Sequence, residues 1–137
     1  MPDKLRLTRA QFEQLLDHAL ACKPEEACAI LAGDNQGAVS RVIPVENVEH
    51  SDITYLMDSE EQFRVFDEIK REGLKMVAIF HSHPHSPAVP SRHDLDLAFY
   101  PDSIYLIVSL MNNVPEGHAY KIVDRTVEEI QIVIEED

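Results

Sequence analysis

The chain has 137 residues, which is the size of one domain with its own hydrophobic core, and 45% of them are hydrophobic, as is ordinary for a globular protein. With 12 basic and 25 acidic residues the formal net charge is −13, so the chain would repel nucleic acid and anionic lipid. No apolar stretch has the length of a signal peptide or a membrane span. The only two cysteines, Cys22 and Cys28, are expected to be reduced thiols. We therefore expect a single domain over residues 1–137, located in the cytoplasm, with no nucleic acid or membrane partner.

The first third of the chain predicts a helix and then a hairpin. Thr8 and Gln11 have the spacing of a capping box, so a helix should begin at Thr8 and end at Pro24. Its apolar spacing predicts a buried face of Phe12, Leu15, Leu16, Ala19 and Leu20. Strands over residues 27–32 and 38–45 flank a turn-forming sequence at residues 34–37.

The next elements are a third strand over residues 53–57 and a second helix. Ser59 and Gln62 repeat the capping-box spacing, and the helix should stop at Gly73. Its apolar stripe is narrow and consists of Phe63, Phe66, Ile69 and Lys70.

The second half predicts mostly strands. A hydrophobic strand starts at residue 75, and a short helix runs from residue 91 to about residue 100, before Pro101. The continuous apolar run at residues 104–110 suits a strand covered on both faces, and two further strands follow near residues 119–123 and 127–134. The expected class is α+β, or mixed α/β: a mixed, mainly antiparallel sheet flanked by two longer helices and one short helix.

Two histidines and an aspartate have the pattern of a metal site. If the strand that starts at residue 75 continues to His83, its period of two puts His81 and His83 on one side of the sheet. Asp94 falls in the first turn of the next helix and can fold back as a third ligand. Three protein ligands with the fourth position left to water are typical of a catalytic zinc site. We therefore expect one Zn²⁺ per chain.

Two further residues complete a hydrolytic site. Glu26 precedes a strand expected to be central, so its carboxylate is the candidate general base and acid, with Glu25 as the rival. Ser91 offers a hydroxyl that can donate to an oxyanion. The spacing of Ser91 and Asp94 is also that of a plain capping box, and both roles can coexist.

His85 and His93 lie near these residues in the sequence. They could be additional ligands, but His85 lies in the loop and His93 points elsewhere on its helix if Asp94 points to the metal. The favoured interpretation gives neither a role in the site, and a position around the ligands or facing substrate is the alternative.

The same residues resemble the JAMM, or MPN-plus, family of zinc metalloproteases. His81-Ser82-His83-Pro84 matches the family's His-Ser/Thr-His-Pro, and Ser91-x-x-Asp94 follows, with seven residues, 84–90, separating His83 from Ser91. The segment 26–33, Glu-Ala-Cys-Ala-Ile-Leu-Ala-Gly, is similar to the family's glutamate-bearing strand, which favours Glu26 over Glu25. Ala29 replaces a frequent glycine there.

The resemblance implies that zinc is held by His81, His83 and Asp94, with Glu26 as general base and Ser91 stabilising the tetrahedral intermediate. It implies hydrolysis of a peptide or isopeptide bond at the C-terminal tail of a ubiquitin-like protein. Compact prokaryotic members look like processors of small sulfur-carrier proteins ending in Gly-Gly. MPN-type domains often pair, so a homodimer is compatible.

Two alternatives remain open at this point: a non-catalytic interaction module stabilised by a metal, and an amidase for a small peptide.

Overall fold

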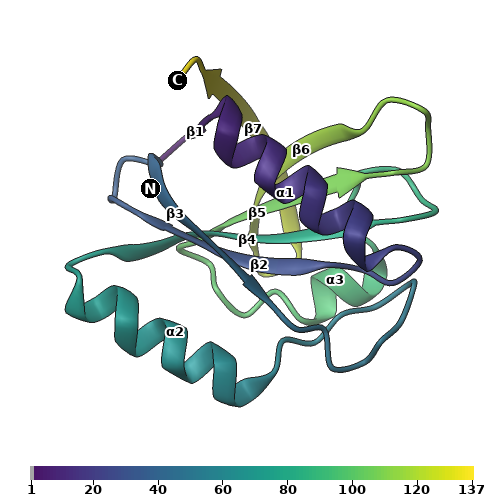
Figure 1. The fold of residues 1–137 in the computed structure, drawn as a ribbon, viewed down its shortest axis with the longest axis horizontal. Helices are drawn as coiled ribbons and strands as arrows, with labels where there is room; N and C mark the ends of the chain where they lie inside the picture. Colours follow the sequence, from purple (N-terminus) through teal and green to yellow (C-terminus); the bar gives the residue numbers. More distant parts are fainter. Residues whose placement is uncertain (1) are drawn as a thin grey trace.

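The computed structural model describes residues 2–137, in which seven strands form one sheet with helices on both faces (Figure 1). The order of the strands across the sheet is β1-β7-β6-β5-β4-β2-β3. The elements are, in chain order, β1 (Lys4–Thr8), α1 (Arg9–Cys22), β2 (Cys28–Gly33), β3 (Val39–Val45), α2 (Ser59–Arg71), β4 (Lys75–His83), α3 (Arg92–Asp96), β5 (Ile104–Ser109), β6 (Glu116–Val123) and β7 (Thr126–Glu135).

The pairing of neighbouring strands confirms the predicted fold class. Four of the six pairs are antiparallel, whereas β1 pairs with β7 and β4 pairs with β5 in parallel. The sheet is therefore mixed and mainly antiparallel, and two longer helices and one short helix accompany it.

The two edges of the sheet meet at one point. The backbone N–H of Arg6 in β1 donates to the carbonyl of Gly37 at 2.8 Å, just before β3. Gly37 has a φ of 84°, and a Cβ there would lie 2.2 Å from the carbonyl oxygen of Lys4. Only glycine suits both conditions, so Gly37 allows the curled sheet to bring its edges together.

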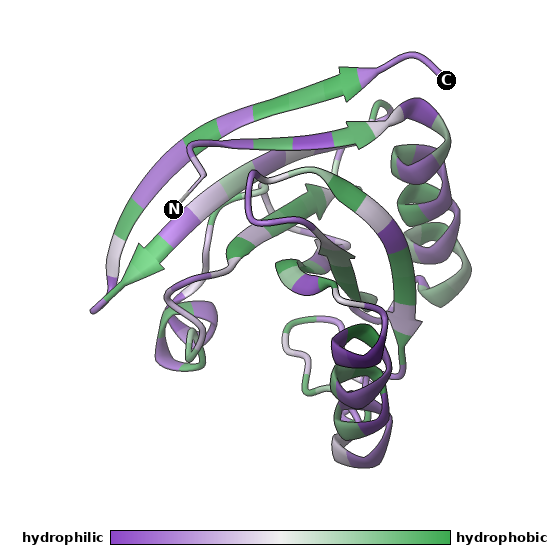
Figure 2. Cartoon of the chain, turned by 90° about the vertical axis from the view of Figure 1, so that its left-hand side faces the viewer, coloured by the Kyte–Doolittle hydropathy of each residue, from purple (hydrophilic) through white to green (hydrophobic). Residues whose placement is uncertain are grey.

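Each face of the sheet has its own core. Helix α1 covers one face with Leu15 and Ala19, and α2 covers the other with Val65 and Ile69 (Figure 1). All six residues of β5 are buried, as its continuous apolar sequence predicted. Figure 2 shows hydrophobic residues concentrated along the central strands and hydrophilic residues over much of α2. The face under α2 and α3 is the one that carries the candidate site.

The start of α1 was predicted well and its buried face only partly. Thr8 caps the helix and forms the full capping box with Gln11. Phe12 and Leu16 are partly buried against the core, but Leu20 is 54% exposed, so its predicted burial is wrong. Ala19 and Cys22 at the same end of the helix still pack against the core, whereas Leu20 lies about 140° around the helix from the buried Leu15 and so points away from the sheet.

The prediction for α2 needs two corrections. Its N-cap is Asp58 rather than Ser59, because the Asp58 carboxylate accepts a hydrogen bond from the N–H of Glu61. Phe63 is 77% exposed instead of buried. It lies about 160° around the helix from Val65, which faces the sheet.

Three further differences concern element boundaries. Strand β1 was not predicted, although Leu5 and Leu7 alternate into the core. Residues 53–57 are not a strand, since apart from one bridge at Met57 their backbone is held by the side chains of Ser51 and Asn47. Helix α3 ends at Asp96 rather than near residue 100. The N–H groups of Ala98 and Phe99 donate to carbonyls only three and two residues back, and the N–H of Tyr100 donates to the hydroxyl of Tyr105, so the helical hydrogen bonds do not continue.

Candidate metal centre and its surroundings

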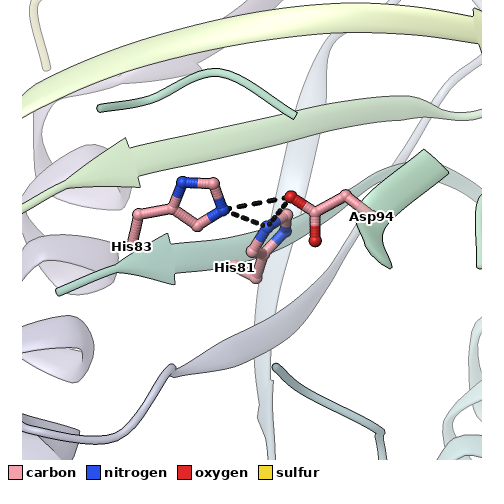
Figure 3. Close-up of side chains that lie close together, drawn as sticks. All are labelled: His81, His83 and Asp94. Carbon is pink, nitrogen blue, oxygen red and sulfur yellow. Dashed lines mark hydrogen bonds and ion pairs between the residues drawn. The ribbon is translucent and has the colours of Figure 1, made fainter. Parts of the chain in front are cut away.

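Strand β4 and helix α3 bring three predicted ligands together. His81 and His83 alternate with Ser82 at the end of β4, so both imidazoles lie on the face toward α2 and α3. Asp94 lies in the first turn of α3, which follows the proline-rich loop. Figure 3 shows the three side chains pointing toward one another.

The ligand atoms form a nearly equilateral triangle. The Nε2 atoms of His81 and His83 are 3.1 Å apart, and Oδ2 of Asp94 lies 3.2 Å and 3.1 Å from them, respectively. Ligand atoms bound to zinc at about 2.0–2.1 Å in a tetrahedron lie roughly 3.3 Å from one another. The three side chains are at most 7% exposed. The triangle therefore fits one tetrahedral cation, and among residues 2–137 it is the one cluster of this kind.

The protonation states also suit a metal. The carbonyl of Pro87 can only accept, so Nδ1 of His83, 2.8 Å away, carries a proton. Without a cation, burial alone would lower the pKa of His83, but hydrogen bonds to Asp94 and Pro87 outweigh burial and raise that pKa, and a bound metal would displace the Nε2 proton and take its lone pair. Burial lowers the pKa of His81, favouring its neutral form. Burial alone would raise the pKa of Asp94, but its hydrogen bonds with both histidines outweigh that effect and lower it. A neutral imidazole and an ionised carboxylate are the forms that bind metals.

An aromatic ring covers one of the ligands. Tyr55, from the connection between β3 and α2, stacks on His81 with ring centroids 4.5 Å apart and an interplanar angle of 24°. Beside it lies a pocket of about 230 Å³ whose lining is mainly apolar and includes Ile79, Leu97, Tyr100 and Tyr105. Tyr55 thus separates the ligand cluster from an apolar pocket.

Glu26 lies next to the ligands across the pairing of β2 with β4. Cys28 pairs with His81, and two bonds between Ala27 and Ser82 extend the register, which places Glu26 opposite His83. Opposed residues of antiparallel strands project to the same face.

The Glu26 carboxylate is buried and lacks a full set of partners. It is 3% exposed, and Oε1 has no hydrogen-bond partner within the described part of the chain. Burial raises the pKa of Glu26 to about 8, and the nearby carboxylate of Asp94 acts in the same direction. Glu25, in contrast, is partly exposed and pairs with His50 at 3.0 Å on the surface.

Ser91 is the N-cap of α3 and forms a complete capping box with Asp94. The Ser91 hydroxyl oxygen accepts from the N–H of Asp94 at 3.0 Å, and the N–H of Ser91 donates to Oδ2 of Asp94 at 2.8 Å. The capping interpretation is therefore confirmed. Since the hydroxyl oxygen acts as acceptor there, its hydrogen stays available to a further acceptor.

The two other histidines near the motif do not join the ligands. His85 lies 3.5 Å from the Asp52 carboxylate on the half-exposed rim of the site. Nε2 of His93 is buried without a hydrogen-bond partner among residues 2–137.

Sequence reasoning missed Asn47, Tyr55 and the role of Ser82. Their contacts join segments far apart in the chain, and no local spacing signals them.

Comparison with known proteins identifies the family. The family model described as prokaryotic homologs of the JAB domain matches residues 8–123. The CysO-cysteine peptidase of Mycobacterium tuberculosis is 39% identical over 119 residues, covering 84% of this chain and 80% of the relative. The desampylase of Haloferax volcanii is 35% identical, covering 77% and 81%. The chain belongs to the prokaryotic JAB-domain family, which confirms the predicted family and its class of hydrolase.

Solved structures agree on the fold. The protein DSY2949 from Desulfitobacterium hafniense superposes with a TM-score of 0.89 at 37% identity, covering 97% of this chain and 94% of the other. The JAB1/MPN domain protein AF2198 from Archaeoglobus fulgidus gives a TM-score of 0.64 at 20% identity, with coverages of 96% and 97%, and shows the fold alone.

None of the helices in residues 2–137 has the length and apolarity needed to cross a membrane.

Proposed function

We propose that this chain is a zinc-dependent peptidase or isopeptidase that cuts the amide bond after the C-terminal tail of a small ubiquitin-like or sulfur-carrier protein. The observation that carries the proposal is the buried triangle of His81, His83 and Asp94 with the Glu26 carboxylate placed beside it. Family membership and the peptidase names of the relatives support the same reaction class.

His81, His83 and Asp94 would hold the zinc ion. Zinc bound there would acidify a water molecule and polarise the carbonyl of the scissile amide. The chain's own contribution would be to present two neutral imidazoles and one carboxylate. The Pro87 carbonyl fixes the ring of His83, and the Ser91 N–H fixes the carboxylate of Asp94. The carboxylate also offsets part of the positive charge of the ion.

Glu26 would move the proton. Its carboxylate accepts a proton from the attacking water as the carbon–oxygen bond forms, and delivers it to the amide nitrogen as the carbon–nitrogen bond breaks. Burial raises the pKa of Glu26 to about 8 in the metal-free site, and the positive charge of a bound zinc ion would lower it and favour the carboxylate form that acts as base.

Ser91 would stabilise the oxyanion of the tetrahedral intermediate. Its hydroxyl oxygen is held by the capping bond from Asp94, so the O–H can be aimed without further ordering of the side chain.

The proposed substrate is a tail ending in Gly-Gly. The mycobacterial relative is named for CysO-cysteine, and the resemblance to compact members points to small sulfur-carrier proteins. Glycine lets a tail backbone approach a recessed site closely because it has no Cβ. A net charge of −13 favours a neutral or basic surface on the partner.

We also propose that the protein acts in the cytoplasm as a single domain over residues 1–137, with pairing of two copies as a further hypothesis. Gel filtration with light scattering tests the pairing.

The test of the proposed function uses purified protein loaded with zinc and three substrates built on one small ubiquitin-like protein. Two carry a Gly-Gly tail, extended by one amino acid or joined to a lysine side chain, and the third carries Ala-Ala in its place. Mass spectrometry should find cleavage after the second glycine and little after Ala-Ala. No cleavage of any tail would support the non-catalytic module instead.

A further inference from the structure

Asn47 lies in the connection between β3 and α2 and is 7% exposed. Its side-chain amide makes four hydrogen bonds. Its Nδ2 donates to the backbone carbonyls of Glu26 at 3.0 Å and Thr54 at 3.1 Å. Its Oδ1 accepts from the backbone N–H groups of Glu49 and Leu56, both at 3.1 Å. A carboxamide offers two hydrogens and two lone pairs, so no capacity is left over.

These four bonds join the two segments that flank the candidate metal centre. The N–H of Glu26 donates to the carbonyl of Ser51 at 2.8 Å, so the connection holds Glu26 through both of its backbone groups. Thr54 and Leu56 are the neighbours of Tyr55, whose ring stacks on His81. The Asn47 amide therefore fixes the backbone at Glu26, whose carboxylate lies beside His83. It also fixes the backbone on both sides of Tyr55, whose ring lies over His81.

On the basis of the proposed function, we propose that Asn47 is a positioning residue. It sets the Glu26 carboxylate against the ligand cluster and holds Tyr55 on His81, without touching the substrate itself. Asparagine is specifically required because the carbonyls of Glu26 and Thr54 need donors. An aspartate of the same shape would place one acceptor oxygen, in the position of Nδ2, against both of them.

A purely stabilising role is the alternative to positioning. In that case loss of the amide lowers the unfolding midpoint, while the folded variant keeps the native turnover number and the native environment of His81. The two roles therefore differ in measurements made on folded protein.

The test compares Asn47→Asp with Asn35→Asp. Asn35 is an exposed residue in the turn between β2 and β3, at the other end of β2 from Glu26. With saturating zinc and a Gly-Gly-tailed substrate, N47D should lose at least tenfold in kcat with KM within twofold of wild type. N35D should match wild type.

A second readout needs no activity. Ring stacking shifts the imidazole proton resonances of His81 in the metal-free protein. These resonances should move toward unstacked values in N47D and stay in place in N35D. Wild-type kcat, or unchanged His81 resonances, in folded N47D would overturn the proposal.

Two remaining outcomes are also decisive. If N47D does not fold, Asn47→Ser takes its place, and failure of both variants to fold assigns Asn47 to stability and rejects positioning. A wild-type protein that cuts no tail refutes the proposed function, whereas an active wild type with a fully active N47D refutes only the role of Asn47.

Discussion

The hydroxyl oxygen of Ser82 accepts a hydrogen bond from the backbone N–H of Ala27 at 2.8 Å, on the face of β4 opposite His81 and His83. Ser82 is fully buried, and its own backbone N–H donates to the carbonyl of Ala27 at 3.0 Å. The residue between two candidate ligands thus fixes the backbone next to Glu26.

This contact predicts a result for Ser82→Ala and Ser82→Thr. The alanine variant leaves the Ala27 N–H buried without a partner, which should cost about 1–3 kcal/mol of unfolding free energy and lower kcat through Glu26. The threonine variant keeps the hydroxyl and should recover most of both. Urea unfolding and steady-state kinetics measure the two effects, and equal losses in both variants would speak against the hydrogen bond as the cause.

Metal binding should depend on Asp94 and not on its neighbour. Asp94→Asn keeps the acceptor for the Ser91 N–H but removes the charge, so zinc content should fall well below one per chain. Asp96, on the same helix, is exposed and pairs with Arg125, and Asp96→Asn serves as control. Elemental analysis gives the stoichiometry.

Zinc removal should also lower the melting temperature of the wild type. A ligand present at about 1,000 times its dissociation constant adds about 4 kcal/mol of stability. A chelator should therefore destabilise wild type and D96N but have little effect on D94N. An equal shift in all three proteins would mean that the metal binds elsewhere.

The two roles of Ser91 can be separated by substitution. Glycine is a tolerable N-cap, so Ser91→Gly should cost only a few tenths of a kcal/mol, whereas loss of an oxyanion donor lowers kcat about 100- to 1,000-fold. Ser91→Thr keeps both functions. Near-wild-type turnover by S91G would leave capping as the sole role of Ser91.

Glu26 should make the stability of the metal-free protein depend on pH. Its pKa is raised from 4.5 to about 8 by burial, so the folded state holds the proton more tightly than the unfolded chain. Glu26 therefore lowers the unfolding free energy as pH rises from 4.5 to 8. The glutamine of Glu26→Gln does not titrate, so the unfolding free energy of this variant lacks the pH-dependent contribution of Glu26.

The stability of E26Q minus that of wild type should accordingly grow by on the order of 2–4 kcal/mol over this range. Urea unfolding in chelator at pH 5, 6.5 and 8 checks it. A constant difference would indicate a carboxylate that titrates normally.

Local patterns in the sequence predicted most features that local forces decide, with the N-cap of α2 as an exception, since Asp58 rather than Ser59 caps that helix. The capping boxes of Thr8 with Gln11 and Ser91 with Asp94 are short-range hydrogen bonds, and both are present. The alternation along β4 placed His81 and His83 on one face because a strand has a period of two. The convergence of Asp94 on them was predicted from the same strand and helix together with the family resemblance.

The remaining features depend on contacts between distant segments. The ring of Tyr55 reaches His81 only because Asn47 replaces a strand ladder around residues 53–57, and no periodicity encodes such a side-chain bridge. Likewise, the exposure of Phe63 follows from which face of α2 meets the sheet.

The most direct test of the central claim, that Glu26 is the proton carrier of a zinc peptidase, is turnover by zinc-loaded E26Q. The glutamine is similar in size and carries no charge, so the variant should bind about one zinc per chain and remain folded. Its kcat on the Gly-Gly-tailed substrate should fall at least 100-fold, in line with the loss of general acid–base catalysis. Cleavage at the wild-type rate by E26Q with zinc bound would contradict the account.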